Sequence, residues 1–304
     1  MNEKKKVTVV GISLVLFVAI LSFGSVFIYK KFTEEKKIVD RSDVLFTLDN
    51  IPEIDGSTAT SPLMDAFIAD FTGKDISDIT KKYSQTHPSY LKLIDGEVDL
   101  IIVTEPSEEE MKYAELKGVE LEVTKVVNEA FVFFVNKDSQ IEDLTLEEIR
   151  GIYSGKYTNW KELNGQDEKI IAFQRPENSG SQTGMLSLVM NGIKMKKPVT
   201  IEYQETMMGI IDVVADYKSG VGSIGYSYYY YANTMYSKEN IKMIGVNGIK
   251  PTFETIRSGE YPIMSAYYIV TRKDADANTK KLRDVMLSVR GQDVAKEVGY
   301  VPVK

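Results

Sequence analysis

The stretch RPENSGSQTGML, residues 175–186, indicates most directly how the chain folds and what it binds. An arginine here stands four residues ahead of a hydroxyl-rich turn that opens a predicted helix. The start of a helix exposes about four unpaired backbone N–H groups and the positive end of its dipole, so Ser179, Gly180 and Ser181 would offer donors to an anion. Arg175 would add a planar, permanently charged group that can meet two oxygens of one oxyanion. A capped helix beside a surface arginine is the alternative interpretation.

Two further turns of similar character occur earlier in the chain. Ser57 and Thr58 lie between an expected strand and an expected helix, and Thr86 lies near the start of the next predicted helix. The apolar run DLIIVT, residues 99–104, predicts a buried strand that is followed at once by Glu105. Because ligands of open α/β sheets bind at the carboxyl ends of strands, these are candidate ligand-binding residues. Ordinary turn chemistry, or a loop carboxylate in water, would also account for each of them taken singly.

Strand-like and helix-like segments alternate from residue 44 onward, which predicts an α/β fold. Two long extended runs, residues 123–137 and 261–271, have room to cross between two lobes. We expect lobe 1 to comprise residues 44–130 plus 265–304, and lobe 2 to comprise residues 131–264. The cleft between such lobes is the default place for a small ligand.

The first 43 residues differ in character from the rest. Residues 1–30 are expected to be a membrane anchor or signal segment, because lysines flank an uncharged run, residues 7–29, that is long enough to span a bilayer as one helix. An uncleaved anchor is favoured, since a signal peptide usually has a shorter apolar core and a small-residue cleavage site. Residues 31–43 are charged and lack an apolar period, which is typical of a stalk. The chain has no cysteine, which excludes a thioether-linked lipid anchor, disulfides and thiolate metal sites.

The charge balance argues against nucleic acid as a partner. Residues 1–40 hold seven of the 37 basic residues and four of the 44 acidic residues, so residues 41–304 carry 30 basic and 40 acidic residues, a formal charge of −10. Proteins bind phosphate backbones with clustered cations, and this surface offers the opposite. A small anion would also be repelled at long range. An anion site must therefore use aimed dipoles in a dry cleft, where hydrogen bonds gain strength.

Six segments together resemble, in the same order, the phosphate-binding protein of bacterial ABC phosphate transporters. They are GSTATSPLMDAF (56–67), LIDGEVDLIIVTEP (93–106), IYSGKYTNW (152–160), RPENSGS (175–181), SGVGSIGYSYYY (219–230) and YPIMSAYYIV (261–270). The motifs G-K-x-T-N-W and R-x-x-x-S-G-S make the similarity specific. It implies an α/β, two-lobe, type II periplasmic-binding-protein-like fold with two crossover strands, here preceded by an N-terminal transmembrane helix. The resemblance also implies that the lobes close on phosphate without any reaction, catalytic residue, metal or cofactor.

The resemblance also implies which residues bind phosphate. By position they are Ser57, Thr58, Ala59, Thr86, Glu105, Arg175, Ser179, Gly180 and Ser181. Glu105 departs most from the family, which has aspartate in a pattern like S-D-A-P where this chain has T-E-P. That acid accepts the proton of hydrogen phosphate and so separates phosphate from sulfate. Asp55 is the substitute candidate for this role.

The partners follow from the same resemblance. They are inorganic phosphate or a similar small oxyanion, the permease subunits of an ABC transporter, and the membrane through residues 7–29. The binding domain is expected outside the cytoplasm, with the span as its tether because the family's lipid-bearing cysteine is missing. A membrane-tethered anion sensor or accessory domain with the same fold is the alternative, since a fold does not fix a function.

A serine hydrolase is the remote alternative. The run from Ser89 to Lys92 fits the S-x-x-K motif of acyl-enzymes, but the companion motifs S-D-N and K-T-G are missing. Residues 151–156 read G-x-x-x-G-K, one residue short of a phosphate-cradling loop, with Tyr157 where serine or threonine should hold magnesium. His87 is the only histidine, so a His-based metal centre is excluded. We therefore do not expect an enzyme.

Overall fold

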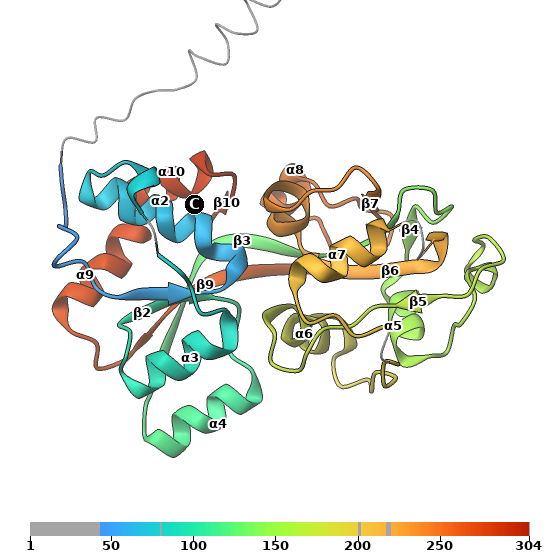
Figure 1. Ribbon diagram of the computed structural model, residues 1–304, viewed down its shortest axis with the longest axis horizontal. Coiled ribbons are helices and arrows are strands. Elements are labelled where there is room, and N and C mark those ends of the chain that lie inside the picture. Colours follow the sequence, from blue (N-terminus) through green and yellow to red (C-terminus); the bar gives the residue numbers. More distant parts are fainter. Residues whose placement is uncertain (1–42, 80, 200–201, 217–219, 304) are drawn as a thin grey trace, which may run out of the picture. The chain divides into compact units, whose positions relative to one another are not determined.

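A mixed β-sheet organises the computed structural model, which describes residues 43–79, 81–199, 202–216 and 220–303 (Figure 1). Its strands are β1 (Ile54–Gly56), β2 (Leu100–Val103), β3 (Leu121–Asn136), β5 (Ile171–Ala172), β6 (Ser223–Tyr228), β7 (Ile241–Met243), β9 (Met264–Arg272) and β10 (Val301–Pro302). The main path runs β1-β2-β9-β3-β6-β5, with β7 and β10 also paired to β3. A separate two-stranded sheet joins β4 (Asp143–Leu144) to β8 (Gly245–Val246). The predicted mixed α/β class is confirmed.

The long strand β3 connects the two halves of the sheet. It pairs antiparallel with β9 up to Ala130, which faces Met264, and with β6 from Phe131 onward. In Figure 1, β3 and β9 run side by side between the two groups of helices. The two extended runs expected from the sequence correspond to these two strands. The change of partner between Ala130 and Phe131 means that one continuous backbone belongs to both halves.

Helices cover both faces of the sheet. They are α2 (Ser61–Thr72), α3 (Thr86–Asp95), α4 (Glu108–Lys117), α5 (Leu146–Ser154), α6 (Gly180–Gly184), α7 (Met207–Ala215), α8 (Phe253–Ser258), α9 (Ala277–Met286) and α10 (Val289–Glu297). The start of α4 shows how the local sequence specifies a helix terminus. The Ser107 side chain accepts from the Glu110 N–H, and the Glu110 side chain accepts from the Ser107 N–H. This reciprocal pair satisfies two donors that the helix start would otherwise leave open.

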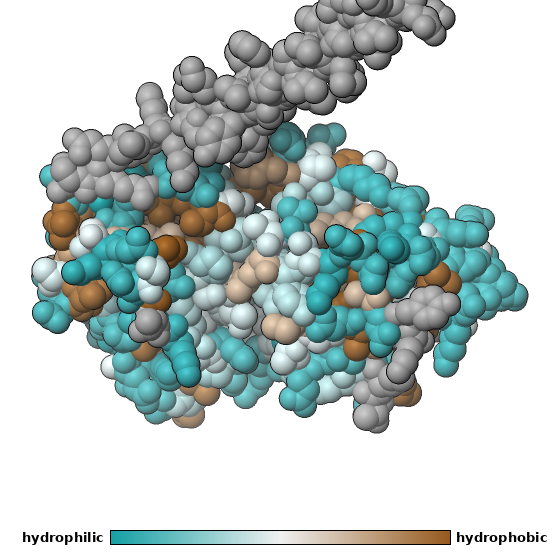
Figure 2. Space-filling view, turned by 45° about the horizontal axis from the view of Figure 1, so that its top comes forward, coloured by the Kyte–Doolittle hydropathy of each residue, from teal (hydrophilic) through white to brown (hydrophobic). Residues whose placement is uncertain are grey.

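Strand β2 shows how the core is divided. Leu100 and Ile102 belong to the main apolar cluster, whereas Ile101 and Val103 pack in a second cluster with residues of α3 such as Tyr90. Successive side chains of a strand point to opposite faces, so both faces of β2 are buried. Its carboxyl end therefore delivers the next residues, Thr104 and Glu105, to a fixed edge of the sheet. The face drawn in Figure 2 is mostly hydrophilic, with apolar residues in small separate patches.

The expected membrane span, residues 7–29, lies outside the described residues. Among the residues that the structure describes, no helix is both long and apolar enough to cross a bilayer.

Candidate functional site

One pocket collects most of the predicted site residues. It has a volume of about 420 Å³ and lies where four segments meet: the turn after β1, the start of α3, the loop that enters α6 and the start of α7. The predicted residues that line it are Ser57, Thr58, Thr86, Arg175, Ser179, Gly180 and Ser181. These residues come from three regions of the chain, and the fold brings them to one place.

Arg175 is a buried cation in the lining of this pocket. Arg175 is only 9% exposed. Its Nε and Nη1 atoms have no hydrogen-bond partner among the described residues. Burial lowers the pKa of Arg175 to about 10, since desolvation penalises the charged form. The groups that act on it electrostatically are the phenols of Tyr226, Tyr231 and Tyr203. A guanidinium in this state is a buried cation with open donors.

The backbone at Arg175 is held by a short polar network. Its N–H donates to Gln182 Oε1 at 3.2 Å and to the Tyr226 hydroxyl at 3.1 Å. The Tyr226 hydroxyl in turn donates to Gln182 Oε1. Strand β6 and helix α6 therefore both fix the place from which the guanidinium extends. We expect this fixation to keep the entropy cost of ligand binding low.

The start of α6 presents further donors. Ser179 caps this helix, with its side chain accepting from the Gln182 N–H at 3.3 Å. Ser181 is 1% exposed, and its Oγ has no hydrogen-bond partner among the described residues. The helix continues from Gly184 as a π-helix through Met190. Its first turn thus offers the pocket unpaired backbone N–H groups and an open hydroxyl.

Gly180 has a steric reason to be glycine. A Cβ atom built on it would lie 2.9 Å from the Thr86 Oγ1 and 2.9 Å from the Thr104 Oγ1. The Gly180 backbone therefore lies so close to these two hydroxyls, which belong to the other half of the sheet, that a residue with a Cβ atom would not fit at position 180. The Tyr228 hydroxyl donates to the Gly180 carbonyl at 3.0 Å and supports it from behind.

The start of α3 is strained at the pocket. Gln85 precedes the helix with φ 78° and ψ 171°, a region that residues other than glycine rarely adopt. Gln85 lines the pocket together with Thr86, which is the first residue of the helix. Strained backbone of this kind clusters at ligand-binding sites, where the surrounding structure enforces it. Sequence reasoning did not single out Gln85, and its residue type carries no signal for this conformation.

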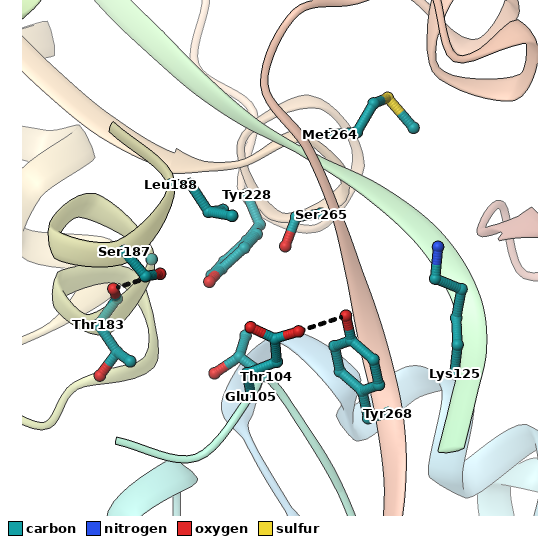
Figure 3. A pocket seen from close by; sticks show the side chains of 11 residues that line it. Thr104, Glu105, Lys125, Thr183, Ser187, Leu188, Tyr228, Met264, Ser265 and Tyr268 are labelled. Atoms are coloured by element: carbon teal, nitrogen blue, oxygen red, sulfur yellow. Dashed lines mark hydrogen bonds between the residues drawn. The ribbon is translucent and has the colours of Figure 1, made fainter. Parts of the chain in front are cut away.

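Two predicted residues do not line this pocket. Ala59 is 1% exposed, and its carbonyl accepts from the Tyr300 hydroxyl at 2.6 Å. Glu105 instead lines a neighbouring cavity of about 210 Å³, shown in Figure 3. There its Oε1 accepts from the Tyr268 hydroxyl at 2.8 Å. Burial and the bond to Glu105 raise the pKa of Tyr268.

The substitute candidate Asp55 is also placed elsewhere. It is 4% exposed, and its Oδ1 accepts from the N–H groups of Gly56 at 2.8 Å and Ser84 at 2.7 Å. Its Oδ2 lies 3.5 Å from Lys92 Nζ. Asp55 therefore holds the two backbone turns around β1 and is not among the residues that line the pocket.

The residues considered for enzymatic chemistry have structural roles. Ser89 is fully buried within α3, and its hydroxyl donates to the Thr86 carbonyl at 2.8 Å. Lys92 donates to the Ser84 hydroxyl at 2.6 Å. The Nδ1 of His87 lies 2.9 Å from Glu110 Oε1. Within the described ranges, no group of three or more metal-ligating acids or histidines comes together.

Sequence reasoning missed the residues that support the site from behind. Tyr226 and Tyr228 were not singled out from the sequence. The alternation along β6 places Tyr226 and Tyr228 on one face. The Tyr226 hydroxyl accepts from the Arg175 N–H, and the Tyr228 hydroxyl donates to the Gly180 carbonyl. The period-two pattern was visible in the sequence, but nothing in it indicated which side of the strand faces the ligand loop.

A pocket with a few converging polar groups is typical of proteins that bind a small solute. The chain belongs to the PBP superfamily, whose domain model matches residues 49–290. It is 29% identical over 262 residues to the phosphate-binding protein PstS of Borreliella burgdorferi, and the match covers 84% of this chain and 91% of that protein. It is 29% identical over 173 residues to the phosphate-binding protein PstS of Bacillus subtilis, covering 56% of this chain and 53% of that relative.

The same fold occurs in solved structures. An ABC-type phosphate transport receptor from Vibrio cholerae superposes with a TM-score of 0.61 at 21% identity, covering 82% of this chain and 98% of that one. The resemblance stated from the sequence is confirmed at the level of the family. The relatives are named as binding proteins, which agrees with the expectation that the chain performs no reaction.

Proposed function

We propose that this protein is an extracytoplasmic solute-binding protein that captures inorganic phosphate, or a similar small oxyanion, for an ABC transporter. The observation that carries the proposal is the buried guanidinium of Arg175, whose Nε and Nη1 donors have no partner among the described residues. Leaving a buried charge without a counter-charge is costly, so such groups are retained where a ligand completes them. The names of the relatives supply the identity of the anion.

The ligand is held by donors from both halves of the sheet. We propose Ser57, Thr58, Ala59 and Thr86 on one side, with Ala59 contributing through its backbone, and Arg175, Ser179, Gly180 and Ser181 on the other. Hydrogen bonds to charged groups contribute about 1.5–3 kcal/mol each. Several of them together can reach micromolar binding after the cost of ordering the partners is subtracted.

Lobe closure is part of the proposed mechanism. We assign residues 44–130 plus 265–304 to lobe 1 and residues 131–264 to lobe 2, because β3 exchanges β9 for β6 between Ala130 and Phe131. The Asn178 side-chain amide, in lobe 2, donates to Glu109 Oε2 in lobe 1. A ligand that contacts both lobes favours the closed state by its preference for that state.

The remaining elements of the proposal concern location. Residues 7–29 would anchor the protein in the membrane as one helix, residues 31–43 would form the stalk, and the binding domain would lie outside the cytoplasm. The partner would be the permease of an ABC transporter, in line with the transport receptor of the same fold.

Isothermal titration of the full chain, kept in a mild detergent, with sodium phosphate tests the function. We expect one site with a Kd in the micromolar range or below. Ser181→Ala should weaken binding about tenfold, because it removes one donor to a charged ligand. Ser187→Ala is the matched control, since this serine lies on the same helix and its hydroxyl bonds the Thr183 carbonyl. Absence of heat with phosphate would overturn the proposed function.

A further inference from the structure

We propose that His87 is a further ligand-binding residue of the anion pocket, which in its protonated form supplies a second cation, so that anion binding is accompanied by proton uptake at this ring. This inference rests on the proposed function and adds to it a coupling between binding and pH. His87 lines the pocket beside Thr86, and it is the only histidine of the chain. Histidine is the side chain whose ordinary titration falls near neutral pH, so its charge can change in the physiological range.

A buried carboxylate holds one side of the imidazole ring. Glu110 is 1% exposed, and its Oε1 lies 2.9 Å from His87 Nδ1. Its Oε2 accepts from the Ser107 N–H at 2.7 Å, at the start of α4. Burial raises the pKa of Glu110, whereas the bonds from Ser107 and His87 lower it. Because a buried carboxylate is costly without a counter-charge, this pairing favours a positive charge on the ring.

The bond to Glu110 also decides what the other ring nitrogen presents. A neutral imidazole whose Nδ1–H donates to a carboxylate has Nε2 as an acceptor, whereas the imidazolium has Nε2–H as a donor. The His87 side chain is 29% exposed and lines the pocket, so a ligand there meets the ring in one of these two states. An acceptor repels an anion and a donor binds it. Anion binding therefore favours the protonated ring.

The start of α3 lacks a donor that most helices would offer here. Gln85 makes no side-chain cap bond at this start, and the third helical residue is Pro88, which has no N–H. Pro88 lines the pocket as well. The first turn of α3 therefore offers the backbone N–H groups of Thr86 and His87, one fewer than a turn without proline. A protonated His87 supplies positive charge at the same helix start.

Other charged groups on the elements packed against α3 are engaged elsewhere. Asp55 of β1 lies 3.5 Å from Lys92 Nζ. Arg272 of β9 donates to a carbonyl near the carboxyl end of α3. Glu105, which follows β2, accepts from the Tyr268 hydroxyl of β9 in the neighbouring cavity. The carboxylate bonded to the ring is therefore that of α4.

The charges inside the pocket leave a place for a second cation. From lobe 2 the lining contains the buried Arg175 and two exposed carboxylates, Glu177 and Glu205. A dianion bound to Arg175 alone would keep one uncompensated charge. Protonation of His87 would compensate it from the side of lobe 1.

Nuclear magnetic resonance of the full chain in mild detergent tests the inference, because a chain with one histidine, purified without a histidine tag, gives one ring signal. The signal of ¹³C-labelled histidine is followed from pH 5 to pH 9 with and without saturating sodium phosphate. We expect phosphate to move the midpoint of this titration upward by at least about half a pH unit, which by linkage corresponds to about threefold tighter binding by the protonated protein. Glu110→Gln, which keeps a side chain able to cap the helix, should move the ligand-free midpoint downward.

Calorimetry of His87→Asn separates this effect from the titration of phosphate itself. Asparagine can donate to Glu110 in place of Nδ1 but carries no charge. Phosphate protonates equally with both proteins, so the ratio of their Kd values isolates the contribution of His87. From pH 8 to pH 5.5 this ratio should change by at least about threefold in favour of the native protein.

The outcomes separate the two proposals. Phosphate binding with an unchanged or lowered histidine midpoint, or with a Kd ratio that is the same at both pH values, would overturn the role of His87 and leave the proposed function standing. An unchanged ligand-free midpoint in Glu110→Gln would overturn the pairing on which that role depends. Absence of heat with phosphate at both pH values would overturn the proposed function and this inference with it.

Discussion

Replacing Arg175 with methionine should weaken anion binding and stabilise the ligand-free protein at the same time. The binding loss follows from two donors, Nε and Nη1, that have no partner among the described residues and are open to the ligand. At about 1.5–3 kcal/mol for each charge-assisted hydrogen bond, Arg175→Met should raise the Kd for phosphate by roughly 10²- to 10⁴-fold. A structural arginine would show no such loss.

The gain in stability follows from the cost of burying the charge. Folding lowers the pKa of Arg175 from its ordinary value to about 10. Because the folded state holds this proton less tightly than the unfolded state, the charge destabilises the fold at every pH below about 10. The cost disappears only as the pH rises through the window between these two values. One pKa unit corresponds to about 1.36 kcal/mol, so methionine, which fills similar volume without charge, should stabilise the free protein by about 1–3 kcal/mol at pH 7.

Urea unfolding followed by tryptophan fluorescence measures this gain. Trp160 is the only tryptophan and is fully buried, so its emission reports loss of the core. Arg272→Met is the matched control, because Arg272 Nη1 donates to the carbonyls of Leu93 at 2.8 Å and Val98 at 3.2 Å. This control should lose stability and keep its affinity for phosphate. A ligand-free Arg175→Met protein that is less stable than the native one would refute the reasoning, as would an unchanged Kd.

Three further predictions concern the surroundings of the site. Gly180→Ala should abolish phosphate binding in calorimetry, since its Cβ would lie 2.9 Å from two threonine hydroxyls; retained affinity would show that the halves separate freely there. Tyr300→Phe should raise the Kd for phosphate several-fold, because it removes a hydrogen bond of about 1 kcal/mol to the Ala59 carbonyl while keeping the ring; an unchanged Kd would show that the loop needs no such support. Burial raises the pKa of Glu129 from 4.5 to about 8, so stability should fall as pH rises between these values. Glu129→Gln should flatten that part of the stability profile in urea unfolding at pH 5, 7 and 9, and an unaltered profile would contradict the assignment.

The sequence predicted the parts of the site that depend on local chemistry. Arg175 and the turn at Ser179 to Ser181 are neighbours in the chain, so their shared role needed only a helix start and a charge. Thr58 and Thr86 could be predicted as site residues for the same reason, since each lies at or near the start of a predicted helix. The strand that joins the two halves was visible as a long extended run.

The direction of Glu105 could not be predicted in this way. Its partner Tyr268 is 163 residues further along the chain. The side chain of Glu105 therefore depends on tertiary packing of β9 against β2, and position after a buried strand fixed only its backbone. The support of Arg175 by Tyr226 depends on the same kind of long-range contact, between β6 and the loop before α6. The resemblance to the family correctly predicted that Glu105 lies at the carboxyl edge of the sheet. It did not show which cavity its side chain faces.

A crystal structure of the protein grown with phosphate tests the central claim most directly. We predict one phosphate ion within hydrogen-bond distance of the Arg175 guanidinium and the Ser181 hydroxyl. Phosphate bound elsewhere, or an Arg175 guanidinium paired with a protein carboxylate while the ion lies apart from it, would contradict the claim.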